Sequence, residues 1–160
     1  ALYQQLSSDI KQLINDKNLQ QPLLIGIRTG GAWLAQRLQH TLELPELGIL
    51  DISFYRDDFD ERGLATQAKG SELPDSIEDR SIILVDDVLM SGRTIRAAMN
   101  EIFDYGRPAS IILATLVDLG ARELPVQPDV TGRVLALQSH QRVKLRGPDP
   151  LHIELQETGH

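Results

Sequence analysis

The chain has 160 residues, 41% of them hydrophobic, which suits one folded domain spanning residues 1–160 with a core of its own. It has no cysteine and no apolar run of membrane length, and its N-terminus has the pattern of an amphipathic helix rather than a signal peptide. We therefore expect a cytoplasmic protein with no membrane association. A net charge of −7 argues against nucleic-acid binding over the whole surface, although a local basic face stays possible.

The first part of the chain alternates helix and strand. Residues 2–14 place their apolar side chains on one helical stripe, and residues 22–27 form an apolar run that is typical of a buried strand. A second helix is predicted to begin after Gly31. The turn between the strand and this helix is Arg28-Thr29-Gly30-Gly31. Backbone N–H groups beside a helix N-terminus can bind an anion, so this turn is either a phosphate site or a tight turn without a ligand.

A third strand is predicted at residues 49–55, where alternation places Leu50, Ile52 and Phe54 on one face. A long polar stretch follows, and between residues 57 and 79 acidic side chains outnumber basic ones. Long loops inside a compact domain are commonly functional lids or solvated insertions. Both interpretations of this surface excursion stay open.

The most informative stretch runs from Ser81 to Thr94. Its apolar run, residues 82–85, predicts a strand buried on both faces, and residues 92–105 have helical spacing. Between them lie two adjacent carboxylates and a small hydroxyl-rich turn: Asp86, Asp87, Ser91, Gly92, Arg93 and Thr94. The hydroxyls and the helix N–H groups can hold a phosphate, and the carboxylates can accept hydrogen bonds from ribose hydroxyls. The alternative is an ordinary turn with a serine N-cap.

The remaining elements complete a sheet. Gly106 and Pro108 are placed to end the helix, and residues 109–117 predict another buried strand that ends beside Asp118. We expect a loop over residues 119–131 and short strands around residues 134–137, 143–145 and 151–155. This order predicts an α/β fold with a mostly parallel sheet flanked by helices. The polar turns of such a sheet meet at the carboxyl ends of its strands.

Other chemistries lack the residues they need. The chain has no cysteine nucleophile, no paired-histidine metal motif and no phosphate-binding loop of the kinase type. Its scattered histidines indicate surface or packing roles.

The stretch from Ile82 to Thr94 resembles the PRPP-binding signature of the type I phosphoribosyltransferases: a hydrophobic strand, two acidic residues and a small Ser-Gly-x-Thr turn. Nearly the whole chain is similar to the PyrR family, whose members are pyrimidine-operon attenuation regulators and uracil phosphoribosyltransferases. The matching segments are residues 25–29, 51–58, 69–71, 82–94, 96–99, 106–108, 116–118 and 122–125. The resemblance implies the type I phosphoribosyltransferase fold and a cytoplasmic homo-oligomer that uses Mg²⁺. The implied reaction converts uracil and PRPP to UMP and pyrophosphate.

The resemblance also implies roles for individual residues. Asp86 and Asp87 would be catalytic and hold the ribose hydroxyls, and Mg²⁺ would be bound mainly through PRPP. The implied substrate-binding residues are Arg28, Thr29 and Gly30 at the pyrophosphate; Arg56, Asp57 and Asp58 in a closing loop; Ser91, Gly92, Arg93 and Thr94 at the 5′-phosphate; Val117 and Asp118 near the base; and Val88, Leu89 and Met90, which link the acidic pair to the phosphate turn. Met90 stands where purine-specific relatives carry an Asp, which disfavours a purine base.

The sequence departs from the PyrR pattern at several positions. Members of that family usually have Arg at Gly30, Tyr at Met90, and Arg and His at Leu119 and Ala121. These departures leave open a second interpretation, a regulatory protein that senses PRPP or UMP with little turnover.

The resemblance implies the leader of a pyrimidine-gene messenger RNA as a partner, bound by a face that includes Arg122. The basic excess between residues 122 and 146 is small, and residues 1–10 contain no Lys, Arg or His. RNA binding is therefore possible but disfavoured.

Overall fold

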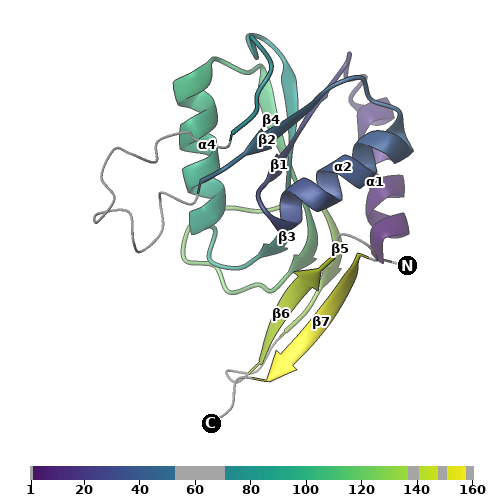
Figure 1. Cartoon of the computed structure of the whole chain (residues 1–160), viewed down its shortest axis with the longest axis vertical. Helices are drawn as coiled ribbons and strands as arrows, with labels where there is room; N and C mark the ends of the chain where they lie inside the picture. Colours follow the sequence, from purple (N-terminus) through teal and green to yellow (C-terminus); the bar gives the residue numbers. More distant parts are fainter. Residues whose placement is uncertain (1, 53–70, 137–140, 148–150, 158–160) are drawn as a thin grey trace.

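The computed structural model describes residues 2–52, 71–136, 141–147 and 151–157 (Figure 1). Its strands are β1 (Leu23–Ile27), β2 (Leu47–Leu50), β3 (Ser81–Leu89), β4 (Ser110–Asp118), β5 (Val130–Val134), β6 (Gln141–Arg146) and β7 (His152–Glu157). Its helices are α1 (Leu2–Asp16), α2 (Gly30–Leu42) and α4 (Arg93–Tyr105). None of the helices in these ranges combines the length and the apolar character needed to cross a membrane.

Five parallel strands form the main sheet in the order β2-β1-β3-β4-β5. The central strands read as continuous apolar runs because helices cover both faces of the sheet. All five residues of β1 are buried, and so are Ile82 to Val85 of β3. The predicted α/β fold with a mostly parallel sheet flanked by helices is confirmed.

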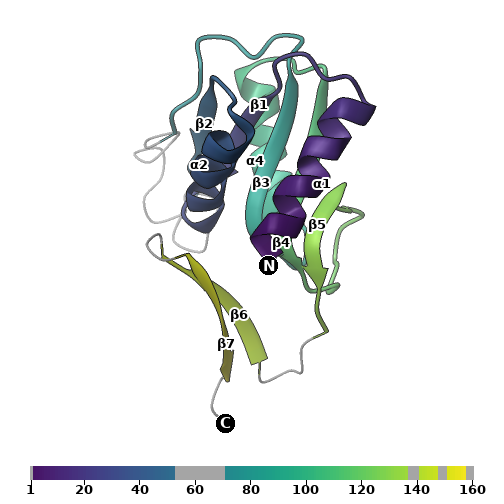
Figure 2. The same ribbon diagram turned by 90° about the vertical axis from the view of Figure 1, so that its right-hand side faces the viewer.

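The helices lie on opposite faces of the sheet (Figure 2). Helices α1 and α2 pack on one face, where Leu6 and Leu34 belong to the same buried cluster. Helix α4 packs on the other face through Ile95, Ala98 and Ile102. The chain therefore leaves β1 toward one face and β3 toward the other, and the switch point of the sheet lies between these two strands.

Strands β6 and β7 pair antiparallel in a separate hairpin, from Gln141↔Glu157 to Arg146↔His152. The hairpin lies beyond the carboxyl ends of the sheet strands (Figure 1). Leu145 of β6 is 5% exposed and joins the buried cluster under α1 and α2. The two predicted C-terminal strands are confirmed, and a single domain over residues 1–160 stays a prediction.

Strand β3 is longer than the apolar run that predicts it. The run ends at Val85, but the strand continues to Leu89 because β4 pairs with it as far as Leu89↔Asp118. Asp86 and Asp87 therefore lie inside a strand, whereas the sequence prediction placed them after its end. The turn proper begins at Met90.

Two other strands and one helix start also differ from the sequence prediction. Strand β2 spans residues 47–50 rather than 49–55, and both Ile49 and Leu50 are buried, so buried and exposed positions do not alternate along it. Residues 53–55 lie outside the described residues. Strand β5 begins at Val130, inside the predicted loop, because β4 offers it a parallel partner from Ala114 onward. Helix α2 begins at Gly30, two residues before Ala32, the first residue of the predicted helix.

The C-terminal part of the predicted polar excursion is packed against the fold. Ile77 is 1% exposed and belongs to the buried cluster that contains α4. The backbone of Glu72 exchanges two hydrogen bonds with Ile49, of 2.7 and 2.8 Å. Residues 71–79 are therefore anchored to the fold at Glu72 and Ile77, while their acidic side chains stay exposed. Residues 57–70 of the predicted excursion lie outside the described residues, so a lid there stays a prediction.

Replacing Ile77 with Ala should destabilise the protein, because it removes a fully buried side chain from the α4 cluster. We expect a loss of about 3 kcal/mol in the free energy of unfolding, measured by urea denaturation. Phe103→Ala is the control, because Phe103 lies on α4 and is 58% exposed; its loss should stay below about 1 kcal/mol. Equal losses in the two variants would show that residues 71–79 do not pack as described.

Candidate active site

The candidate site lies where β1 and β3 separate. Their pairing ends at Gly26↔Val85, whereas β3 and β4 stay paired to Leu89↔Asp118. Beyond Val85, β3 thus keeps one strand neighbour and borders a cleft on its other side. The cleft has a volume of about 750 Å³.

The cleft brings together residues from four parts of the chain. Those predicted as site residues are Arg28, Thr29, Gly30, Asp86, Asp87, Val88, Met90 and Thr94. Those that sequence reasoning did not name are Ile27, Trp33, Asp51, Lys144 and Leu145. Lys144 and Leu145 come from the hairpin. Alternation in β6 could have indicated one exposed and one buried residue, but no sequence signal places the hairpin over the sheet edge.

The acidic pair is held by the backbone. Asp86 is 6% exposed, and its Oδ1 accepts a hydrogen bond of 2.9 Å from the N–H of Asp87. The Oδ1 of Asp87 accepts one of 2.8 Å from the N–H of Val88. These bonds orient both carboxylates at the floor of the cleft.

Gly30 allows the start of α2 to approach Asp87. A Cβ atom at position 30 would lie 2.2 Å from Oδ2 of Asp87, which is less than any van der Waals contact. The positive end of the α2 dipole therefore lies beside this carboxylate. The turn before it, whose Arg28–Thr29 peptide bond is cis, lines the same end of the cleft.

The turn after β3 leads directly into α4. Gly92 has a φ of 95°, a left-handed conformation that glycine adopts without steric cost, and it is the residue that caps the helix. The Oγ of Ser91 accepts a hydrogen bond of 3.1 Å from the N–H of Arg93. Thr94 lines the cleft from the first turn of α4. N–H groups of a first helical turn have no acceptor within the helix, so this end of the cleft suits an anion.

Arg93 points toward the loop after β4. Its Nε lies 2.7 Å from Oε1 of Glu123, and the two side chains are 65% and 59% exposed. An ion pair this exposed contributes little to stability. The guanidinium can therefore leave Glu123 for an anionic ligand at low cost.

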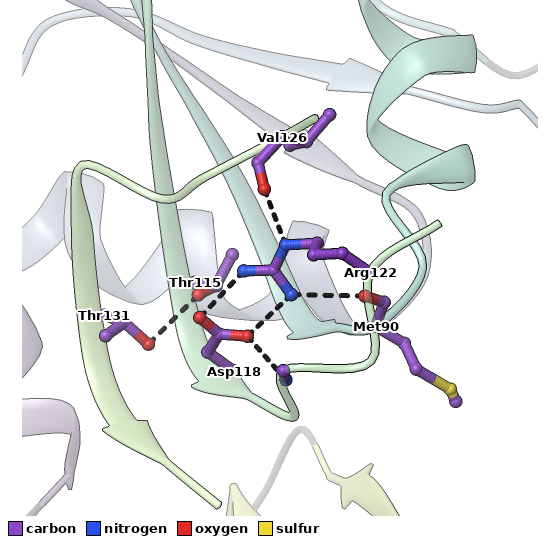
Figure 3. Close-up of polar contacts among 7 residues, drawn as sticks. Met90, Thr115, Asp118, Arg122, Val126 and Thr131 are labelled. Carbon is purple, nitrogen blue, oxygen red and sulfur yellow. Dashed lines mark hydrogen bonds and ion pairs between the residues drawn. The ribbon is translucent and has the colours of Figure 1, made fainter. Parts of the chain in front are cut away.

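Asp118 forms an ion pair with Arg122 (Figure 3). Both carboxylate oxygens accept from the guanidinium at 2.8 Å, and the N–H of Gly120 donates to Oδ1 at 2.9 Å. The hydrogen bonds from Arg122 lower the pKa of Asp118 below its ordinary value, against the opposing effect of burial. Neighbouring Val117 is fully buried in the core.

The structure thus divides the predicted site residues into groups. Of the described residues predicted for the site, six are not part of the lining of the cleft: Leu89, Ser91, Gly92, Arg93, Val117 and Asp118. Arg56, Asp57 and Asp58 lie outside the described residues.

Comparisons with known proteins agree with this geometry. The family model for the phosphoribosyl transferase domain matches residues 1–143. A bifunctional protein PyrR of Pseudomonas fluorescens is 54% identical over 158 residues, which cover 98% of this chain and 94% of the relative. The corresponding protein of Pseudomonas entomophila is 55% identical over 157 residues, with 98% and 91% coverage.

Solved structures share the fold at low identity. A hypoxanthine-guanine phosphoribosyltransferase of Bacillus anthracis superposes with a TM-score of 0.68 at 17% identity, covering 89% of this chain and 81% of that chain. A purine phosphoribosyltransferase of Pyrococcus horikoshii gives a TM-score of 0.63 at 22% identity, with 84% and 83% coverage.

The sheet, its cleft and the matched domain define a type I phosphoribosyltransferase. Within that class the chain belongs to the PyrR family. The resemblance on which the sequence prediction rested is confirmed.

Asp118→Asn should destabilise the protein at neutral pH, because it removes a carboxylate whose pKa is lowered by Arg122. A lowered folded-state pKa stabilises the fold above the unfolded value, about 3.9, and this stabilisation is lost as pH falls through the folded value. We expect urea denaturation to show a cost of about 2 kcal/mol at pH 7 that shrinks below pH 4. Glu123→Gln in the exposed pair should cost less than about 0.5 kcal/mol. A cost for Asp118→Asn that does not depend on pH would contradict the ion pair.

Proposed function

We propose that this protein is a uracil phosphoribosyltransferase that converts uracil and PRPP to UMP and pyrophosphate. The observation that carries the proposal is the order of groups along one cleft. Thr29 and Gly30 lie at the start of α2, Thr94 lies at the start of α4, and Asp86 and Asp87 lie between them. Two anion sites with carboxylates between them match PRPP, which carries pyrophosphate and phosphate on either side of a ribose.

The reaction follows from these positions. With the 5′-phosphate at the α4 turn, the ribose hydroxyls reach the carboxylates of Asp86 and Asp87. Glycosyl transfer develops positive charge on the sugar, which fixed carboxylates stabilise in a partly buried site. The N–H groups near Thr29 and Gly30 stabilise the departing pyrophosphate. The protein needs to perform little acid–base chemistry.

Mg²⁺ is the cofactor we propose for this site. Among the described residues no group of three or more His, Asp or Glu side chains is arranged to bind a metal ion. Mg²⁺ commonly binds through substrate phosphate oxygens, waters and one or two carboxylates, and Asp86 and Asp87 supply the carboxylates here. The PRPP oxygens would hold the ion, which would neutralise charge on the pyrophosphate.

A pyrimidine base fits the cleft better than a purine. Met90 lines the cleft, is 48% exposed and offers a thioether where purine-specific relatives carry an Asp. A thioether is at most a weak hydrogen-bond acceptor. The purine enzymes among the solved structures share only the fold with this chain.

One observation favours the alternative, a protein that binds PRPP or UMP with little turnover. Gly30 replaces the Arg that PyrR proteins usually have, and the side chain nearest to it is the carboxylate of Asp87. A pyrophosphate there gains backbone N–H groups without this additional cation. The turnover assay below separates the two functions.

With uracil, PRPP and Mg²⁺ the wild-type protein should form UMP and pyrophosphate, and two site variants should fail. Asp87→Asn should lower kcat/KM about 100-fold, because it removes charge that stabilises the sugar cation. Thr94→Ala should raise the KM for PRPP about tenfold, because it removes a phosphate donor. The measurement is the initial rate of UMP formation.

Two controls make this test specific. Asp104→Asn changes an exposed carboxylate on α4 and should retain wild-type rates. Thr94→Ser keeps the hydroxyl and should recover most of the affinity for PRPP. Tight UMP binding without turnover by the wild-type protein would favour the sensor, and wild-type kinetics in Asp87→Asn would refute the assigned site.

RNA attenuator recognition is the second activity of the family, and we propose that this chain has lost it. Support comes from Arg122, expected from the resemblance to contact RNA. Its guanidinium makes four hydrogen bonds to Asp118, Val126 and Met90, and its side chain is 20% exposed. Cations that are paired inside the protein release few counterions from a nucleic acid.

Filter binding against a pyrimidine-operon leader should therefore show weak association at physiological salt, in the range of non-specific binding. A scrambled RNA of the same length is the control and should bind equally well. Tight binding that discriminates the leader from the scrambled RNA would contradict this proposal.

A further inference from the structure

The loop after β4 holds the turn after β3 through three consecutive carbonyl groups. We call residues 119–126 the clamp segment. Its backbone N–H groups donate to Leu89 O at 2.9 Å and twice to Ser91 O, at 2.9 and 3.1 Å. The carbonyl between these two, that of Met90, accepts at 3.1 Å from the guanidinium of Arg122 (Figure 3). All three carbonyl oxygens are therefore bound by the clamp segment.

This arrangement suits a turn that binds an anion. Carbonyl oxygens carry partial negative charge and repel a phosphate, whereas N–H groups attract one. Hydrogen bonds from the clamp segment keep the three oxygens occupied, while the N-terminus of α4 and Thr94 border the cleft. The carbonyl of Met90 accepts from a side chain, that of Arg122, whereas the other two accept from backbone N–H groups. A substitution of Arg122 can therefore remove this hydrogen bond.

Arg122 is itself fixed in place. Its two terminal nitrogens donate to the carboxylate of Asp118 at 2.8 Å each, and its Nε donates to Val126 O at 2.5 Å. Val126 in turn packs against Gly92, where an added Cβ would lie 3.2 Å from the Cβ of Val126. The end of β4 is thus linked through one side chain to the start of α4.

We infer that Arg122 is a positioning residue for the 5′-phosphate turn: it holds the carbonyl of Met90 away from the ligand and keeps the turn in its binding conformation. The inference rests on the proposed function, which places the phosphate there. Arg122 is absent from the described lining of the cleft, and Asp118 neutralises its charge. It therefore acts through geometry and not by attracting the phosphate.

Arg122→Lys tests whether Arg122 acts through geometry or through charge. Lys keeps the charge, but its single ammonium group cannot bind both oxygens of Asp118 and the carbonyls of Val126 and Met90 at once. Isothermal titration with Mg²⁺ should give a dissociation constant for UMP about tenfold higher than that of the wild type. Pyrophosphate, which we assign to the Arg28–Gly30 end, should bind with unchanged affinity. The KM for PRPP should rise more than kcat falls. Arg133→Lys, at an exposed position of β5, is the matched control and should change neither affinity.

Asp118→Asn provides a second variant, which loosens Arg122 without replacing it, and it should also weaken UMP more than pyrophosphate. Thermal unfolding of each variant shows that the folded protein is being titrated. Unchanged UMP affinity in both variants, or equal losses for UMP and pyrophosphate, would overturn the inference. Wild-type protein that binds UMP and pyrophosphate but forms no UMP would refute the proposed reaction alone. Wild-type protein that binds no UMP would overturn both.

Discussion

The site depends on one difference in strand length. Strand β1 ends at Ile27 and turns into α2, while β3 and β4 stay paired to Leu89↔Asp118. The end of β3 is therefore hydrogen-bonded to β4 on one side and, among the described residues, has no strand neighbour on the side of β1. Because the two crossover helices leave toward opposite faces, nothing in the sheet fills the opening, and ligands of open α/β sheets bind at this kind of position.

The proposed function requires a protein with a net charge of −7 to bind an anionic ligand. The carboxylates of Asp86 and Asp87 are buried or half-buried between the N-termini of α2 and α4, which carry partial positive charge. The local potential in the cleft depends on these helix dipoles and on the charged side chains that line it, Arg28 and Lys144 among them, rather than on the net charge of the protein.

Much of the sheet could be predicted from the sequence because β1, β3 and β4 are apolar runs bounded by polar turns. The acidic pair and the Ser91–Thr94 turn were recognised because their chemistry is local. Strand β5 and the end of β3 were misjudged because pairing with β4, a non-local interaction, fixes their limits. The burial of Ile77 and the role of Arg122 were missed for the same reason: each depends on contacts with a segment distant in the sequence or irregular in structure.

The central claim is that one cleft holds a phosphoribosyl group between two anion sites. A crystal structure of the protein with PRPP and Mg²⁺ tests it most directly. The account predicts the 5′-phosphate at Ser91 to Thr94, the ribose hydroxyls at Asp86 and Asp87, and the pyrophosphate at Arg28 to Gly30. A PRPP molecule bound in the reverse direction, or outside the opening between β1 and β3, would contradict it.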